Sequence, residues 1–118
     1  MKIAIVGSRN IDADIPEGII PENVTGIYSG AAKGIDTSAR RYAIKHGILI
    51  TEILPEYNLY GKTAPLKRND LIISMADEVY IFWDGKSRGS TYVIKKCREI
   101  NKPHHLFRYK DNQFEEIT

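Results

Sequence analysis

Residues 78–91, EVYIFWDGKSRGST, contain the pattern that decides the fold of this chain. Five consecutive apolar residues, Val79 to Trp83, predict a strand that is covered on both faces, as the strands of a parallel sheet are. A loop rich in glycine, hydroxyl and basic residues follows, and a helical pattern runs from about Ser90 to Asn101. This stretch therefore predicts a strand–loop–helix unit.

The same alternation extends over the whole chain. Strands are predicted at residues 3–6, 26–29, 48–54, 78–83 and 104–109. Helices are predicted from Ile35 to a stop at Gly47, from about Pro65 to Ala76, and from about Ser90 to Asn101. In the connection 10–25, the prolines and Gly18 allow only a short helical turn. The segment 110–118 is open between a last short strand and a frayed tail.

Strands that alternate with helices predict an α/β fold. The expected architecture is one Rossmann-like domain over residues 1–118, doubly wound, with a mainly parallel five-stranded sheet and helices on both faces. In such folds the ligand binds at the carboxyl ends of the strands, near the point where the strand order reverses.

Composition excludes several classes of protein. The 118 residues are 42% hydrophobic and 27% charged, which is typical of a globular chain and excludes intrinsic disorder. The longest apolar run, Val79 to Trp83, is far shorter than the roughly 20 residues that span a bilayer, so no membrane partner is expected. The net charge of +2 is too small to argue for nucleic acid by itself.

Cys97 is the only cysteine, which rules out a disulfide within one chain and favours a cytoplasmic location. We expect Cys97 to be a core residue. His104 and His105 are neighbours in a predicted strand and point to opposite faces, so no metal site is predicted, and no cofactor. A homodimer is possible, because exposed helices of small α/β domains often pair.

Three loops that leave strands have the composition of anion sites. The first holds Gly7, Ser8 and Arg9, and the second runs from Ser29 to Thr37 into a helix. The third runs from Asp84 to Thr91 into another helix. Because the topology brings all three to one edge of the sheet, they predict a crevice for a ligand with one or more phosphates. From these loops the predicted ligand-binding residues are Gly7, Ser8, Arg9, Ser29, Gly30, Ala31, Lys33, Gly34, Asp36, Asp84, Gly85, Ser87, Gly89, Ser90 and Thr91.

Aromatic and polar residues between the third and fourth strands extend this prediction. Tyr60, like Tyr57, and Trp83 at the end of its strand are candidates to stack on a base. Lys62, Arg68 and Asn69 are the remaining predicted ligand-binding residues, and Arg68 with Asn69 opens a helix.

Structural roles compete with several of these functional ones. The Gly7 loop is equally consistent with an ordinary strand-to-loop turn. Asp36 is a candidate to cap its helix, and so is Ser87 or Ser90 in the third loop. Trp83 is a candidate for plain core packing.

Taken together, these motifs resemble the SLOG superfamily, which includes the DNA-processing proteins Smf/DprA and the Lonely-guy cytokinin-activating enzymes. The resemblance covers roughly residues 2–108 and is nearest to small, single-domain bacterial and phage members. It rests on these segments: Gly7-Ser8-Arg9, Ser29-Gly30-Ala31-Ala32-Lys33-Gly34-Ile35-Asp36, Tyr60-Gly61-Lys62 with Arg68-Asn69, and the run from Phe82 to Ser90.

The resemblance implies a Rossmann-like fold with a pocket for nucleotides or nucleotide-derived ligands. Lonely-guy enzymes remove ribose 5′-phosphate with an Arg and a Glu. Arg68 matches that Arg, but the glycine motif PGGxGTxxE lacks its acid here, because Tyr92, Val93 and Ile94 follow Thr91. The DNA-processing proteins share the SG-x-A-x-GID pattern and the Arg-Asn pair, and they bind single-stranded DNA.

Three functional hypotheses follow. The first is binding of an ADP-ribose-, NAD- or AMP-like nucleotide, as a sensor, carrier or sink. The second is a phosphoribohydrolase acting on nucleoside monophosphates, in which Asp36 orients water or stabilises the ribose cation and Arg68 holds the phosphate. The third is single-stranded nucleic-acid binding, which is not favoured for so short and so weakly basic a chain.

Overall fold

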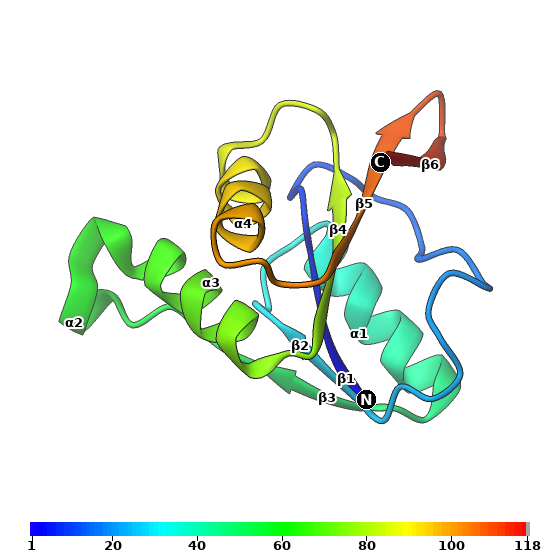
Figure 1. The fold of residues 1–118 in the computed structure, drawn as a ribbon, viewed down its shortest axis with the longest axis horizontal. Coiled ribbons are helices and arrows are strands. Elements are labelled where there is room, and N and C mark those ends of the chain that lie inside the picture. The colour runs from blue at the N-terminus through cyan, green and yellow to red at the C-terminus, as the bar shows by residue number, and fades with distance from the viewer. Residues whose placement is uncertain (118) are drawn as a thin grey trace.

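A six-stranded sheet forms the centre of the molecule in the computed structural model, which describes residues 1–117 (Figure 1). The strands are β1 (Lys2–Gly7), β2 (Gly26–Ser29), β3 (Leu49–Glu52), β4 (Glu78–Trp83), β5 (His104–Lys110) and β6 (Gln113–Ile117). They lie in the order β3-β2-β1-β4-β5-β6; the first five are parallel and β6 is antiparallel to β5. The predicted α/β class with a mainly parallel sheet is confirmed.

The predicted count of five strands is wrong, because the segment left open at the C-terminus forms β6. Asp111 and Asn112 both adopt the left-handed conformation, with φ of 53° and 61°. They form the two-residue loop of a hairpin that pairs Lys110 with Gln113. Phe114 then packs edge-on against Phe82, with ring centroids 5.2 Å apart. Thr118, the last residue of that segment, lies outside the described residues.

The helices are α1 (Ile35–His46), α2 (Tyr57–Tyr60), a 3₁₀ turn η1 (Gly61–Thr63), α3 (Ala64–Met75) and α4 (Arg88–Glu99). The three long helices lie where they were predicted, whereas α2 and η1 were not predicted. Helix α4 starts two residues earlier than expected and ends at Glu99, which leaves Ile100 exposed rather than in the core.

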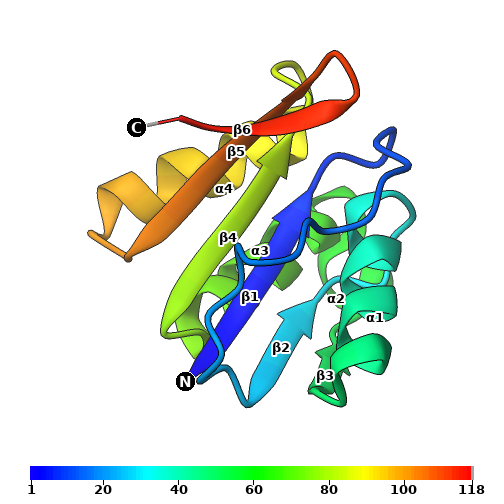
Figure 2. The ribbon, with the colours of Figure 1, turned by 90° about the vertical axis from the view of Figure 1, so that its right-hand side faces the viewer.

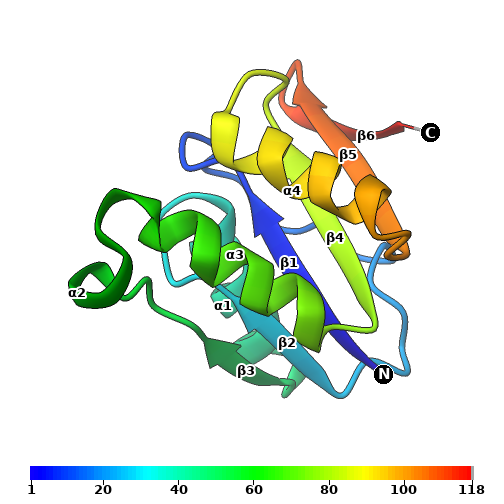
Figure 3. The same ribbon diagram turned by 60° about the vertical axis from the view of Figure 1, so that its left-hand side comes forward.

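Alternating side chains of the central strands supply two separate cores. Ile3 and Ile5 of β1 pack with α1 on one face of the sheet. Ala4 and Val6 face the other way and pack with α3 and α4, which lie side by side on that face (Figure 3). Cys97 of α4 is fully buried in this second core, as predicted.

The connection between β1 and β2 covers the half of the first face that α1 leaves open. The predicted short helical turn is wrong: the segment 10–25 forms turns without a helix, as its prolines and Gly18 favour. Figure 2 shows this segment crossing in front of β1 and β4. Its apolar side chains, among them Ile11 and Ile15, belong to the same buried cluster as Tyr80 and Phe82. Within residues 1–117, no helix has the length and apolar character needed to cross a membrane.

Candidate functional site

The strand order has a reversal between β1 and β4, and the candidate site lies there. The chain steps from β1 to β2 and β3 on one side, and then returns to place β4 on the other side of β1. At this reversal the loops that follow β1 and β4 separate, which leaves a crevice at the carboxyl ends of the strands. A cavity of about 430 Å³, here named the main cavity, occupies this position. Its lining residues are Val6, Gly7, Ser8, Arg9, Asn10, Gly30, Ala32, Asp36, Pro65, Leu66, Arg68, Asn69, Asp84, Ser87, Arg88, Gly89, Ser90 and Val93.

Ser8 makes hydrogen bonds that connect the loops lining the main cavity. Its Oγ accepts a hydrogen bond from the N–H of Asp84 (3.0 Å) and shares another with Ser87 Oγ (2.8 Å). Its backbone N–H donates to the carbonyl of Phe82, and its carbonyl accepts from the N–H of Ile35. Only 1% of Ser8 is exposed. The hydroxyl predicted to contact a ligand therefore joins the loops after β1 and β4 to each other.

Two glycines permit close packing around the cavity. A Cβ on Gly7 would lie 2.3 Å from the carbonyl oxygen of Phe82, so this position has no room for a side chain. A Cβ on Gly30 would lie 2.6 Å from Nη1 of Arg68 and 2.9 Å from Oδ2 of Asp36. Gly30 thus allows a buried cation and a buried carboxyl to approach the backbone after β2.

Arg68 is a buried cation in the cavity wall, with 8% of its surface exposed. Its Nη1 donates to the carbonyls of Gly30 (2.7 Å) and Ile53 (3.3 Å), and its Nε donates to Oδ1 of Asn69 (2.8 Å). Among the described residues, no hydrogen bond involves Nη2. Burial lowers the pKa of Arg68, but a guanidinium stays protonated at neutral pH.

Asp36 lies in the first turn of α1 and is 7% exposed. It does not cap the helix, since Gly34 occupies the N-cap position; instead its Oδ2 accepts a hydrogen bond from the N–H of Ala32 (3.1 Å). Burial raises the pKa of the Asp36 carboxyl, and the Ala32 N–H and the charge of Arg68 offset part of this rise. Oδ1 makes no hydrogen bond among the described residues, but the Ser29 side chain lies close enough to the carboxyl to lower its pKa.

The first turn of α4 supplies hydrogen-bond donors to another part of the lining of the main cavity, apart from Arg68 and Asp36. Ser87 occupies the N-cap position but makes no side-chain capping bond, so the predicted capping by Ser87 or Ser90 is wrong. The N–H groups that follow Ser87 at this helix start, up to that of Ser90, have no intrahelical carbonyl to bond. Ser90 itself is 3% exposed, and within residues 1–117 its Oγ has no hydrogen-bond partner. An unpaired hydroxyl beside free N–H groups in a cavity wall is suited to an anionic ligand.

Asp84 shapes the loop that leads into α4. Its Oδ1 accepts hydrogen bonds from the N–H groups of Lys86 and Ser87, both at 2.8 Å. Although burial opposes the shift, these two bonds lower the pKa of the Asp84 carboxyl. The Asp84 carboxylate is therefore ionised at neutral pH, and its hydrogen bonds to the backbone hold this loop in place.

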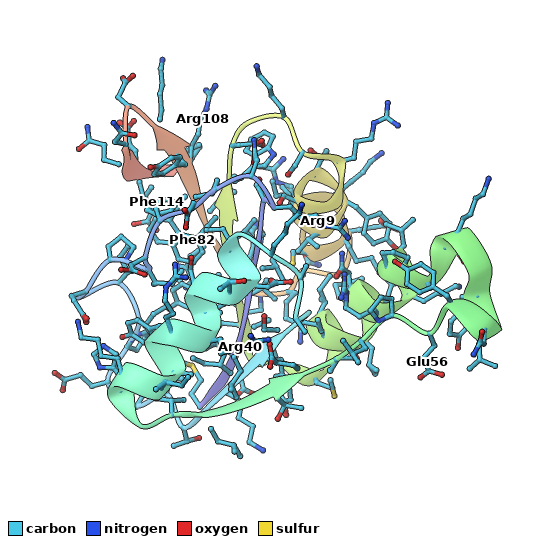
Figure 4. All side chains as sticks on the ribbon, turned by 180° about the vertical axis from the view of Figure 1, so that it is seen from behind. Arg9, Arg40, Glu56, Phe82, Arg108 and Phe114 are labelled. Atoms are coloured by element: carbon cyan, nitrogen blue, oxygen red, sulfur yellow. The ribbon has the colours of Figure 1, made fainter. Side chains whose placement is uncertain are left out.

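A second, smaller hollow of about 220 Å³ adjoins the main cavity and is named here the side hollow. Arg9, Gly30, Ala32 and Arg68 line both spaces. The side hollow adds Ala31, Lys33, Leu54 and Pro55. Figure 4 shows Arg9 reaching into the region between α1 and α4.

The structure brings many of the predicted ligand-binding residues to these two spaces. Eleven of them line the main cavity: Gly7, Ser8, Arg9, Gly30, Asp36, Arg68, Asn69, Asp84, Ser87, Gly89 and Ser90. Ala31 and Lys33 line the side hollow.

Other predicted residues lie elsewhere. Tyr60 and Lys62 are exposed in α2 and η1, which project from the body of the molecule (Figure 1). Trp83 is partly buried and packs against the second core, in agreement with its structural alternative. Four more line neither space: Ser29, Gly34, Gly85 and Thr91.

The sequence patterns missed part of the lining. Val6 and Val93 belong to apolar patterns that are typical of core, and Pro65 and Leu66 lie in the first turn of a helix for which no ligand contact was predicted. Leu66 is instead 37% exposed beside the main cavity. Arg88 was inside the quoted third loop, and its charge was the available signal.

Compared with known proteins, the chain matches no family model, no curated protein and no solved structure. The chemistry of the site is therefore inferred from its own residues.

Proposed function

We propose that this chain is a nucleotide-binding domain that holds a phosphate-bearing ligand in the main cavity. The observation that carries the proposal is the buried, unpaired hydroxyl of Ser90 beside the free N–H groups of the first turn of α4. Phosphate oxygens accept several hydrogen bonds at once, and the positive end of a helix dipole favours a negative charge there. A phosphate at this position would pair the Ser90 hydroxyl.

Other features of the main cavity fit the rest of a nucleotide. Nη2 of Arg68 offers a charged donor, and Oδ1 of Asp36 offers an acceptor for a ribose hydroxyl. The volume of about 430 Å³ falls within the range of roughly 300–1,000 Å³ that is usual for small-molecule sites. The apolar side chains of Val6, Leu66 and Val93 supply wall for a less polar part of the ligand.

The fold supports the same proposal. The order β3-β2-β1-β4-β5, with α1 on one face and α3 and α4 on the other, is the arrangement expected of a doubly wound, Rossmann-like domain. The resemblance of the loops to the SLOG superfamily implies the same class of ligand and forms part of this proposal. The ligands in view are ADP-ribose-, NAD- and AMP-like, and the role is that of a sensor, carrier or sink.

One observation favours a second function, phosphoribohydrolase activity on a nucleoside monophosphate. Asp36 is a buried carboxyl with a raised pKa in the wall of the main cavity, and such groups are often catalytic. In this reaction water would replace the base at the anomeric carbon, and Arg68 would hold the phosphate. The products would be free base and ribose 5-phosphate.

Ser90→Ala separates a ligand-binding role from a structural one. Removing a buried hydroxyl that makes no hydrogen bond should leave the free energy of unfolding unchanged or raise it, whereas loss of a donor to phosphate should weaken binding by about tenfold. The control is Ser74→Ala, since Ser74 is exposed on α3 and bonds only the carbonyl of Leu71. Binding of AMP, ADP-ribose and NAD is measured by calorimetry, with free base assayed in the same samples.

The outcomes distinguish the two functions. Binding that weakens in Ser90→Ala, with the nucleotides recovered intact, supports the binding function. Release of free base that is lost in Asp36→Asn supports the hydrolase. If no phosphate-bearing ligand binds the wild-type protein, or if Ser90→Ala binds as the wild type does, the proposal is wrong.

A further inference from the structure

The side hollow is not used by the ligand described so far, yet it continues directly from the main cavity. Arg9, Gly30, Ala32 and Arg68 form walls of both spaces. A mononucleotide phosphate at α4 and its ribose at Asp36 would leave the side hollow empty. The continuity of the two spaces allows a longer ligand to enter both.

The two spaces differ in charge. The main cavity is lined by ionisable side chains of both signs, since Asp36 and Asp84 lie there with three arginines. The side hollow is lined by Arg9, Lys33 and Arg68, with no carboxylate among the described residues that line it. The rest of its wall is apolar or backbone, including Leu54 and Pro55. Such a surface favours an anionic group more strongly than the main cavity does.

The main cavity and the side hollow together form one groove, and the order of the chemical groups along it indicates which ligand groups each part can bind. Ser90 and the first turn of α4 stand in the wall of the main cavity, and Lys33 stands in the side hollow. Asp36 lies at the junction, because it bonds Ala32 and adjoins Gly30, which are both shared walls. A carboxylate accepts hydrogen bonds from sugar hydroxyls but repels phosphate. The groove thus presents a phosphate site, a sugar site and a second anion site in that order.

We infer that the ligand is a nucleotide with phosphate groups on both sides of one ribose, the second of which lies in the side hollow beside Lys33. This inference rests on the proposed function. It narrows the ligand to the nucleoside bisphosphate class, of which a nucleoside 3′,5′-bisphosphate is the smallest example.

The test compares three probes at one ionic strength: AMP, ADP and adenosine 3′,5′-bisphosphate, with the uridine series in parallel. The bisphosphate should bind at least about ten times more tightly than AMP or ADP, which is the gain expected of one charge-assisted contact with an exposed lysine. In Lys33→Gln this preference should fall to about one, while the affinity for AMP is kept. Lys95→Gln is the matched control, because Lys95 is an exposed lysine of α4 that lines neither space.

Each other outcome overturns a defined part of the argument. Equal binding of AMP and the bisphosphate, or a preference that survives in Lys33→Gln, refutes the second anion site. A preference for ADP over the bisphosphate shows adjacent phosphates and refutes the placement across the ribose. If neither AMP nor any other probe binds, the proposed function itself fails, and the inference fails with it.

Discussion

Replacing Ser8 by alanine tests whether this hydroxyl joins the loops around the main cavity. Ser8 Oγ takes part in two hydrogen bonds, with the N–H of Asp84 and with the hydroxyl of Ser87. A typical hydrogen bond contributes about 0.5–1.5 kcal/mol to stability, so the loss of two predicts a decrease of about 1–3 kcal/mol in the free energy of unfolding. Because both partners are partly shielded from water, we expect a value near the middle of this range.

Urea denaturation at 25 °C, followed by the fluorescence of Trp83, measures this change. With a denaturant dependence of about 2 kcal/mol per molar urea, the midpoint for Ser8→Ala should fall by about 1 M. The double variant with Ser87→Ala should cost less than the sum of the two single variants, because the two hydroxyls share one bond. Ser74→Ala serves as the control, and its effect should stay within about 0.5 kcal/mol. A midpoint for Ser8→Ala equal to that of the control would refute the reasoning.

Three further predictions concern the groups around the site and in the core. Gly30→Ala should lower stability by about 1–3 kcal/mol and abolish nucleotide binding, because the new Cβ displaces Arg68 and Asp36; a wild-type urea midpoint contradicts this. The carboxyl of Asp36 should titrate above 3.8 in carbon-detected NMR. The pKa of the Asp36 carboxyl is higher in the folded than in the unfolded protein. Its contribution to the free energy of unfolding is therefore largest below the unfolded pKa and is lost as the pH rises through the folded pKa. Asp36→Asn should flatten this decline of stability with pH. Cys97 is fully buried and its pKa is raised to about 11, so a thiol reagent at mildly alkaline pH should modify the protein only after urea is added.

Local sequence patterns were sufficient for most of the fold. The apolar run Val79 to Trp83 forms β4 with the expected bounds, because a parallel strand that is covered on both faces must be apolar throughout. The strand predicted at residues 26–29 likewise has the bounds of β2. Where local composition was weak, the sequence left a strand and a frayed tail open: β6 depends on the positive φ angles of Asp111 and Asn112 and on the packing of Phe114 against a distant strand.

The candidate site was predictable as a set of loops but not as a set of contacts. Parallel strands place their carboxyl ends on one edge, so the loops after β1, β2 and β4 were expected to converge. Spacing could not show that Ser8 bonds Ser87 or that Trp83 packs against the core. It also could not show that Tyr60 lies away from the site, since its position depends on where α2 projects.

The sequence by itself determined the alternation of strands and helices, and with it the edge of the sheet where the loops meet, because periodicity and glycine positions act over a few residues. Only the tertiary structure decided which polar groups on that edge are already satisfied. Ser8 and Asp84 are hydrogen-bonded within the protein, whereas the Ser90 hydroxyl is buried with no partner in the part of the chain that the structure describes. The physical reason is that hydrogen-bond satisfaction depends on atoms brought together from distant segments, such as Ser8 and Ser87, which are 79 positions apart in the chain.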